Sequence, residues 1–370
     1  MISRRRLTQA MTTAAAGYGG LLAGGGSPAA AAARPGPRAG RGGTDGRARG
    51  LGPVRHARTH LLNIAYHEVG PANGTPVVLS HGWPFSPVGS YAEVAPVLAR
   101  HGYRCLIPYL RGHGETRFRR ADTFRSGQQG ALGADHIAFL DALGIRRALF
   151  AGYDWGGRAA DVVAALWPQR CIGLVSVNNY LIQNIAAAQE PLAPSLETGF
   201  WYFFYFLTER GRAGLEQNRK ELARVVWHRN SPEWQFTEAE LDEAAGLWTN
   251  PDYVDVVIHS YRHRLGAAPG DPRYDDIEAR LAEQPPITVP TVTLDGQADG
   301  APRGPTGRPR PPTSRAPACI TWFPAPDTTS PRNAPTPSSP RSSRSPRSPD
   351  TDRTPSHTHK HSPAHTPGRP

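Results

Sequence analysis

The stretch 147–163 limits the folds open to this chain more than any other. A short apolar run ends at a turn flanked by Gly152 and Gly156, and alanine-rich sequence with helical spacing begins at Arg158. The small residues let strand and helix crowd together and hold the central residue, Asp154, in the strained, exposed position of a nucleophile elbow. An aspartate there can attack an electrophilic sp3 carbon and form an alkyl ester. The alternative is a plain strand–helix turn with an aspartate cap.

The excess of basic residues lies at the two ends of the chain. Residues 1–58 and 301–370 hold 21 of the 42 lysines and arginines but only 4 of the 31 acidic residues, so 59–300 carries a net charge of −6. The overall charge of +11 is therefore no indication that the folded part binds nucleic acid. The middle is long enough for one α/β domain with an insertion. The three cysteines are too few and too scattered for a disulfide framework or a zinc site, and we expect no metal and no cofactor.

The first residues have the pattern of an export signal. A twin-arginine motif at 3–7 precedes the weakly apolar segment 10–22 and a run of alanines at 29–33. We predict that residues 1–33 are a signal peptide for the twin-arginine (Tat) export machinery, which implies a secreted, periplasmic or cell-envelope protein. The apolar segment is too short and too rich in glycine to be a stable membrane anchor. Residues 34–58 are predicted to be a disordered leader, and the alternative for this end of the chain is a basic cytosolic tail.

A second loop is predicted to approach Asp154. The alternating segment 61–70 favours an antiparallel edge strand, and 76–80 favours a buried strand that leads into His-Gly-Trp-Pro at 81–84. A loop at the carboxyl end of such a strand can direct a backbone N–H toward the end of a neighbouring strand. We therefore predict an oxyanion hole made by the N–H groups of Trp83 and Trp155, although the loop can also be read as a simple proline turn.

Strands and helices alternate through the rest of this region. This order favours a mostly parallel sheet covered by helices on both faces. His113 lies in a glycine-flanked loop with no nearby carboxylate in the sequence to orient its ring, so we interpret it as structural. The predicted helices are 91–101 and 132–143, and the predicted strands are 103–108, 145–150, 172–177 and 289–294.

Three motifs together carry a resemblance. Arg111-Gly-His-Gly114 lies between the loop at 81–84 and Gly152-Tyr-Asp-Trp-Gly156, and this combination resembles the epoxide hydrolase branch of the α/β-hydrolase superfamily over about residues 59–300. The resemblance implies the α/β-hydrolase fold with an inserted helical cap and Asp154 as the nucleophile. Haloalkane and fluoroacetate dehalogenases share the aspartate elbow and the following tryptophan, so these motifs do not choose between the branches. The supporting motif positions are His81, Gly82, Pro84, Gly152 and Gly156.

The insertion at 178–265 has helical periodicity and is rich in aromatic residues. It divides the hydrolase core into 59–177 and 266–300. It resembles the cap of epoxide hydrolases, in which two tyrosine hydroxyls donate hydrogen bonds to the epoxide oxygen as its C–O bond breaks. By position, Tyr202 and Tyr261 look like that pair, with Tyr205 as the competitor of Tyr202. All three can also be read as core aromatic residues.

The resemblance also implies an acid and a histidine that activate water. It places the acid three residues beyond a glycine after strand 289–294, which matches Asp299, with Asp295 as the weaker alternative. It places the histidine after one further strand. Residues 301–370, however, contain 18 of the 38 prolines and no leucine, valine or glutamate, which is the composition of a low-complexity tail and not of a last strand and helix. The tail histidines can be read as a metal-binding tag, which we interpret as accidental, and they are His357, His359, His361 and His365.

The genetic code connects this tail with the missing motif. When the third base of each codon is joined to the first two bases of the next, Cys319–Asn333 is compatible with His-Val-Val-Pro-Gly-Ala-Gly-His-Asn-Leu-Pro-Gln-Glu. The join between Asp327 and Thr328 must encode His or Tyr. We hypothesise a shift of one base near residue 300.

The sequence thus predicts an exported hydrolase that opens a small epoxide to a vicinal diol through an aspartyl ester and is impaired by the missing histidine. One rival is a dehalogenase acting on a small halide, and another is a non-catalytic hydrolase-like protein. Resequencing the codons for 296–303 tests the frame, because a continuous frame with the same tail in related chains would contradict the shift.

Overall fold

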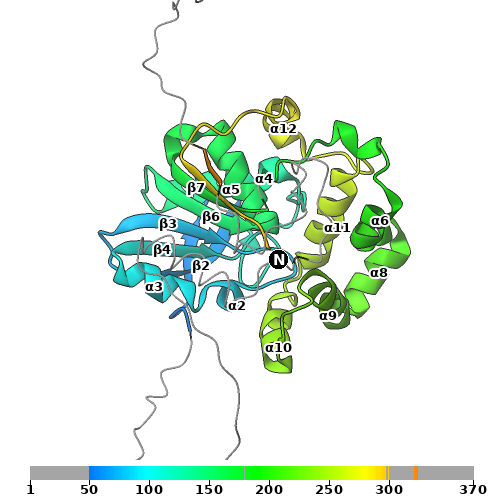
Figure 1. Ribbon diagram of the computed structural model, residues 1–370, viewed down its shortest axis with the longest axis horizontal. Coiled ribbons are helices and arrows are strands. Elements are labelled where there is room, and N and C mark those ends of the chain that lie inside the picture. Colours follow the sequence, from blue (N-terminus) through cyan, green and yellow to red (C-terminus); the bar gives the residue numbers. More distant parts are fainter. Residues whose placement is uncertain (1–49, 179, 297–298, 300–320, 324–370) are drawn as a thin grey trace, which may run out of the picture. The chain divides into compact units, whose positions relative to one another are not determined.

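The computed structural model describes residues 50–178, 180–296, 299 and 321–323, in which one mostly parallel sheet carries helices on both faces (Figure 1). Its strands are β1 (Arg55–Arg58), β2 (Leu62–Val69), β3 (Thr75–Ser80), β4 (Tyr103–Pro108), β5 (Arg117–Phe118), β6 (Ala148–Tyr153), β7 (Cys171–Val177), β8 (Thr291–Leu294) and β9 (Thr321–Phe323). The order across the sheet is β1-β2-β4-β3-β6-β7-β8-β9, and β5 pairs with β2. Neighbours among β4, β3, β6, β7 and β8 pair in parallel, and the other pairs are antiparallel. The predicted mostly parallel sheet is confirmed.

The domain begins earlier than the sequence indicated. Leu51 is only 2% exposed in the core, and residues 55–58 form β1, which pairs with β2. The prediction of a disordered leader as far as residue 58 is therefore wrong for these residues, because β1 is held by backbone pairing and by buried Ala57, which composition does not reveal. The prediction of β2 as an edge strand is also wrong, because β2 pairs with β1 on one side and with β4 on the other. The predicted signal peptide, 1–33, lies outside the described residues.

The side chains of β3 alternate between two cores, one on each face of the sheet. Val78 packs with Phe139 of α4 (Gln129–Ala142) and Val163 of α5 (Asp154–Leu166), whereas Leu79 packs on the other face with Val94 of α3 (Val94–Arg100). This period of two is the reason that β3 reads as a continuous apolar run. The helix predicted at 91–101 corresponds to α3, and a separate short helix that was not predicted, α2 (Pro87–Tyr91), precedes it and is capped by the Ser86 side chain.

A group of helices, which we call the cap, follows β7 in the chain and lies beside the sheet in Figure 1. The α-helices of the cap are α6 (Pro194–Glu197), α7 (Trp201–Leu207), α8 (Glu209–Gln217), α9 (Arg219–Asn230), α10 (Glu238–Leu247) and α11 (Tyr253–Arg264). The chain then returns to the core through α12 (Asp275–Ala282), and the 3-10 helices are η1 (Pro168–Arg170), η2 (Ala186–Gln189), η3 (Thr198–Phe200) and η4 (Pro272–Tyr274). The cap packs on the core through buried aromatic rings; Trp227 Nε1, for example, donates a hydrogen bond of 2.9 Å to the Pro84 carbonyl.

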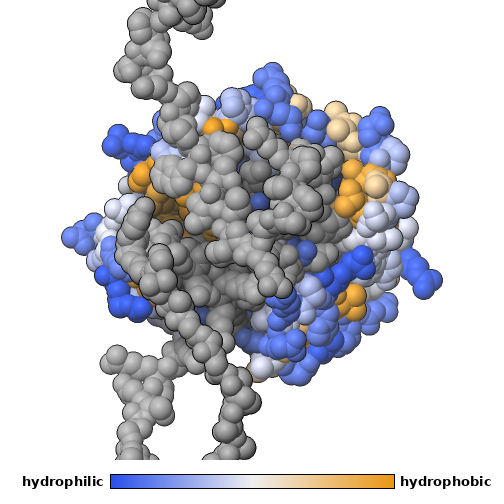
Figure 2. Space-filling model, in the orientation of Figure 1, coloured by the Kyte–Doolittle hydropathy of each residue, from blue (hydrophilic) through white to orange (hydrophobic). Residues whose placement is uncertain are grey.

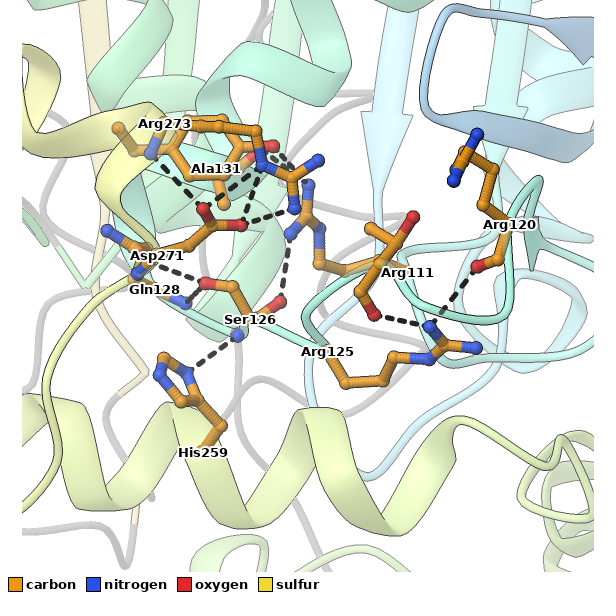
Figure 3. A network of polar contacts seen from close by, with 12 residues as sticks. Arg111, Arg120, Arg125, Ser126, Gln128, Ala131, His259, Asp271 and Arg273 are labelled. Carbon is orange, nitrogen blue, oxygen red and sulfur yellow. Dashed lines mark hydrogen bonds and ion pairs between the residues drawn. The ribbon is translucent and has the colours of Figure 1, made fainter.

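A polar network fixes the position of α11 relative to the core (Figure 3). The guanidinium of Arg111 is buried and donates 2.9 Å to the carbonyl of Ser126. The next residue, Gly127, donates its N–H to His259 Nδ1 on α11 at 2.9 Å. Because His259 lies two residues before Tyr261, this core loop sets the position of a predicted site residue. Further contacts in the network join Arg125 to Asp252, Asp271 to Gln128, and Arg273 to Asp271.

The described surface is mainly hydrophilic in the view of Figure 2, with scattered hydrophobic groups. Its most exposed large apolar side chains are Phe124, Ile172, Phe204 and Val225. No described helix has the length and apolar character needed to cross a membrane.

The last described strand, β9, corrects one prediction about the tail. Residues 321–323 form β9, which pairs antiparallel with β8, so the expectation of no strand within 301–370 is wrong for these three residues. The free edge of β8 offers unpaired N–H and C=O groups to any extended segment, and Thr-Trp-Phe has high β propensity. The tail histidines lie outside the described residues.

Candidate active site

The turn between β6 and α5 has the strained backbone that the sequence predicted. Asp154 is the first residue of α5 and has a backbone φ of 52°, a value that residues other than glycine rarely adopt. The neighbouring glycines allow the close approach that this turn requires. A Cβ on Gly152 would lie 2.5 Å from the carbonyl carbon of Gly156, and a Cβ on Gly156 would overlap the Ser80 carbonyl oxygen. The side chain of Asp154 is thus presented at the carboxyl end of the parallel sheet.

The loop after β3 meets Asp154 directly. The backbone N–H of Trp83 donates a hydrogen bond of 2.7 Å to Asp154 Oδ1. Gly82 makes this approach possible, since a Cβ there would lie 2.8 Å from Asp154 Cβ. The peptide bond between Trp83 and Pro84 is cis. Trp155 is the second residue of α5, so its N–H is one of the first-turn donors that an α-helix leaves without an intrahelical partner.

Two cap tyrosines lie against Trp83 and against each other. The ring centroids of Tyr202 on α7 and Tyr261 on α11 are 5.5 Å apart, and both rings contact the Trp83 indole, at 5.5 and 5.3 Å. Burial and the negative charge of Asp154 raise the pKa of Tyr202. Burial, Tyr202 and Asp154 likewise raise the pKa of Tyr261. Both phenols are therefore neutral at physiological pH and can donate hydrogen bonds.

Tyr205 does not share this environment. Its hydroxyl lies against Gly214 on α8, where an added Cβ would overlap it. Its carbonyl accepts a hydrogen bond of 2.8 Å from the Thr208 side chain at the start of that helix. Of the two candidates on α7, the structure therefore brings Tyr202 toward Asp154.

Two further cap residues support these groups and were missed from the sequence. The hydroxyl of Tyr253 accepts a hydrogen bond of 2.9 Å from Trp83 Nε1. The Asn230 side chain forms a hydrogen bond with Tyr202, which opposes the increase in the pKa of that phenol. No local pattern marks either residue, because each acts on a partner that is distant in the sequence.

The histidines of the two flanking motifs are buried inside the core. Burial and the neighbouring His113 lower the pKa of His81 to about 3, and burial lowers the pKa of His113 to about 4. His81 Nε2 accepts from the Leu110 N–H at 3.2 Å, and His113 Nδ1 donates to the Arg111 carbonyl at 3.0 Å. Both rings are neutral and have no access to solvent, which agrees with the interpretation of His113 as structural.

The strand register places Asp295 level with the nucleophile. Gly152 pairs with Ser176, and Ser176 pairs with Thr293 of β8. Asp295 lies two residues beyond Thr293, as Asp154 lies two beyond Gly152. The two strands are separated only by β7, so β6 and β8 themselves are about 10 Å apart along the hydrogen-bonding direction.

Asp299 lies further along the loop that follows β8 and is partly buried. Its assignment as the acid stays a prediction, as does the lack of a histidine partner. A catalytic histidine at the place that the resemblance implies would come from the chain after residue 300, most of which lies outside the described residues.

Comparison with known proteins agrees with this geometry. The profile of the alpha/beta hydrolase fold family matches residues 75–262, which include the elbow, the Trp83 loop and nearly all of the cap. The chain belongs to this family. It is 27% identical to epoxide hydrolase A of Mycobacterium tuberculosis over 268 residues, which cover 65% of this chain and 80% of that protein.

One solved structure is considerably more similar. A candidate epoxide hydrolase from Klebsiella pneumoniae is 50% identical, with a TM-score of 0.67, over 68% of this chain and 83% of that chain. A non-heme chloroperoxidase of Streptomyces lividans is 36% identical over only 118 residues, 31% of this chain and 41% of that protein. The more extensive matches make this chain an α/β-hydrolase of the epoxide hydrolase type.

Proposed function

We propose that the chain opens an epoxide by forming an ester at Asp154. The observation that carries the proposal is the hydrogen bond from the Trp83 N–H to Asp154 Oδ1, because the Trp83 indole also contacts both tyrosine rings. Oδ1 already accepts this bond, so Oδ2 is the attacking atom and Oδ1 becomes the carbonyl oxygen of the ester.

The bonds change in a balanced way during this step. Asp154 Oδ2 forms a bond to a ring carbon, the C–O bond of the epoxide breaks, and its electron pair moves to the oxygen. Tyr202 and Tyr261 donate hydrogen bonds to that oxygen, and one phenol transfers its proton as the alkoxide forms. Their raised pKa values keep both phenols protonated before the reaction.

The second half of the reaction needs a histidine for which we propose that the chain as written has no counterpart. Water must attack the ester while the N–H groups of Trp83 and Trp155 stabilise the oxyanion, and a histidine oriented by Asp299 would remove the proton of that water. Without such a base, hydrolysis of the ester is slower by about two to four orders of magnitude. We therefore expect the ester to accumulate, with about one turnover per chain on the time scale of its formation.

Mass spectrometry of the intact chain and of its peptides tests the proposal. Incubation with styrene oxide is expected to add one substrate mass to the peptide that contains Asp154. The Asp154→Asn variant, which keeps the shape of the side chain, is expected to give no adduct. A folded chain that gives no adduct, or an adduct elsewhere, would contradict the proposal.

A dehalogenase is the second candidate, because it would use the same aspartate. A departing halide needs no proton, so the tyrosine pair would be dispensable for it. Styrene oxide and 2-chloroethylbenzene separate the two, with adduct formation from the epoxide but little halide release expected. A non-catalytic role would follow if neither compound reacts with the folded chain.

We also propose that residues 1–33 direct export by the Tat route, on the basis of the twin-arginine pattern. Replacement of Arg4 and Arg5 by lysine is expected to retain the chain inside the cell. Export of the unchanged and the substituted chain to the same extent would contradict this.

A further inference from the structure

Two arginines lie on the helices that carry the reacting groups. Arg158 is four residues after Asp154 on α5, and Arg264 is three residues after Tyr261 on α11. Residues at these spacings share one face of a helix. Each guanidinium therefore lies on the same side of its helix as a group of the proposed reaction.

The same short segment contacts both arginines. Arg158 Nε donates 3.1 Å to the carbonyl of Leu181, and Arg264 Nη2 donates a long hydrogen bond of 3.4 Å to Gln183 Oε1. The guanidinium carbon of Arg264 also lies 5.3 Å from the Tyr261 ring centroid and 4.4 Å from that of Phe203. These contacts join both guanidinium groups to neutral partners, namely a backbone carbonyl, a side-chain amide and two aromatic rings.

Within the described residues, neither guanidinium forms an ion pair with a carboxylate. Nε and Nη1 of Arg264 are buried and have no hydrogen-bond partner there. By contrast, Arg262, two residues before Arg264, bonds both to the Phe206 carbonyl at 3.0 Å and to Glu209 at 2.9 Å. Arg219 Nε is also buried without a partner in the described part of the chain, but its Nη1 donates to the Trp248 carbonyl. Buried donors without partners are costly, so the arrangement at Arg264 calls for an acceptor from outside the described chain.

The local charges define that acceptor. Arg158 and Arg264 carry two positive charges, and Asp154 carries one negative charge. Asp161 lies one turn beyond Arg158 on α5. Because burial raises its pKa to about 7, its carboxyl group is only partly ionised, and only partly negative, at pH 7. Burial and the charge of Arg264 lower the pKa of Arg158 to about 9, which still leaves it protonated at pH 7. Among the charged groups that act on Arg158, the excess is therefore up to one positive charge.

We propose that Arg158 and Arg264 bind a carboxylate on the substrate, so that the preferred epoxides carry such a group close to the ring. A single carboxylate matches the charge excess and can accept two hydrogen bonds from a guanidinium. A phosphate dianion would exceed the charge excess, and a neutral substrate would leave that excess unbalanced. The reactive half of this proposal rests on the proposed function, and the binding half does not.

An unreactive pair of ligands tests the binding half. 3-Phenylpropanoate and 3-phenylpropanamide have nearly the same shape and differ by one charge, and fluorescence of the site tryptophans reports their binding to the full chain. We expect the carboxylate to bind at least about tenfold more tightly, since hydrogen bonds between charged groups are roughly twice as strong as neutral ones. Arg264→Met is expected to remove this difference, and the matched Arg262→Met variant is expected to keep it.

The outcomes separate the two proposals. Equal binding of carboxylate and amide by the unchanged chain would overturn the carboxylate site, and so would an unchanged preference in a folded Arg264→Met variant. If circular dichroism shows that this variant is unfolded, the relative affinity of the unchanged chain for the two ligands still tests the carboxylate site. Preference for the carboxylate without any adduct from 3-phenylglycidate would support the carboxylate site and count against ester formation. Equal adduct formation from 3-phenylglycidate and from its amide would support ester formation and count against the carboxylate site.

Discussion

The two halves of this active site are built from different parts of the chain. The half proposed to form the ester comes from the ends of β3 and β6 and from cap helices α7 and α11, all before residue 265, and its other groups contact Trp83. The half proposed to hydrolyse the ester also needs Asp299 in the loop after β8 and a histidine from the chain beyond it, which has the composition of a low-complexity tail. If the proposed reaction and the hypothesised frame shift are correct, a change confined to the end of the chain separates two steps of one reaction.

Replacement of the nucleophile has the largest expected effect on the first half. Asn tolerates a positive φ, so Asp154→Asn is expected to keep the fold. The rate of adduct formation is expected to fall by about three orders of magnitude or more. The rate of mass addition checks this, with circular dichroism as the control for folding. Normal adduct formation by this variant would assign the nucleophile to another residue.

The cap tyrosines come next. Tyr202→Phe and Tyr261→Phe are each expected to slow ester formation about 10 to 100-fold, because one hydrogen bond to the departing oxygen is lost. The reacting form of each phenol is the protonated one, which exists below its pKa, and burial raises both pKa values above the ordinary 10.0. The adduct rate of the unchanged chain is therefore expected to stay level up to pH 10. A rate that halves by pH 9 would show that the phenols are not buried donors.

A smaller effect is expected at the loop that positions the Trp83 N–H. A Cβ in Gly82→Ala would lie 2.8 Å from Asp154 Cβ and 2.7 Å from the Tyr153 ring. The loop must move away, which misplaces the attacking carboxylate, and the rate of ester formation is expected to fall about five- to tenfold. The adduct rate of this variant measures the effect, and Gly246→Ala, where an added Cβ meets nothing within 4 Å, is the control. Equal rates in the two variants would show that the Trp83 N–H is not needed.

The smallest effect is expected at Tyr205. Its hydroxyl lies against α8, away from the pair formed by Tyr202 and Tyr261. Tyr205→Phe is expected to change the rate of ester formation by less than about twofold, which is within the range of neutral surface substitutions. A loss as large as that in Tyr202→Phe would reverse the assignment of the two tyrosines.

Much of the first half of the site could be predicted from the sequence, since its signals are local. The glycines at 152 and 156 mark the turn that holds Asp154, and the apolar runs mark β3 and β6. The identities of Tyr202 and Tyr261 depended on the resemblance, and only the structure separates Tyr202 from Tyr205.

The features that escaped prediction depend on partners far apart in the chain. Tyr253 bonds Trp83 across 170 residues, and His259 bonds Gly127 across 132. Pairing of β1 with β2 likewise fixes the start of the domain without a signal in composition. Distant pairs of this kind are set by tertiary packing and leave no periodic pattern.

The most direct test of the divided site is the stoichiometry of the reaction. Styrene oxide consumed and diol released are measured per chain, for the chain as written and for a chain whose reading frame is restored after residue 300. The chain as written is predicted to consume about one equivalent and to release almost no diol. The restored chain is predicted to release diol continuously. Continuous release by the chain as written would contradict the account, because it would show that the hydrolytic half is already present.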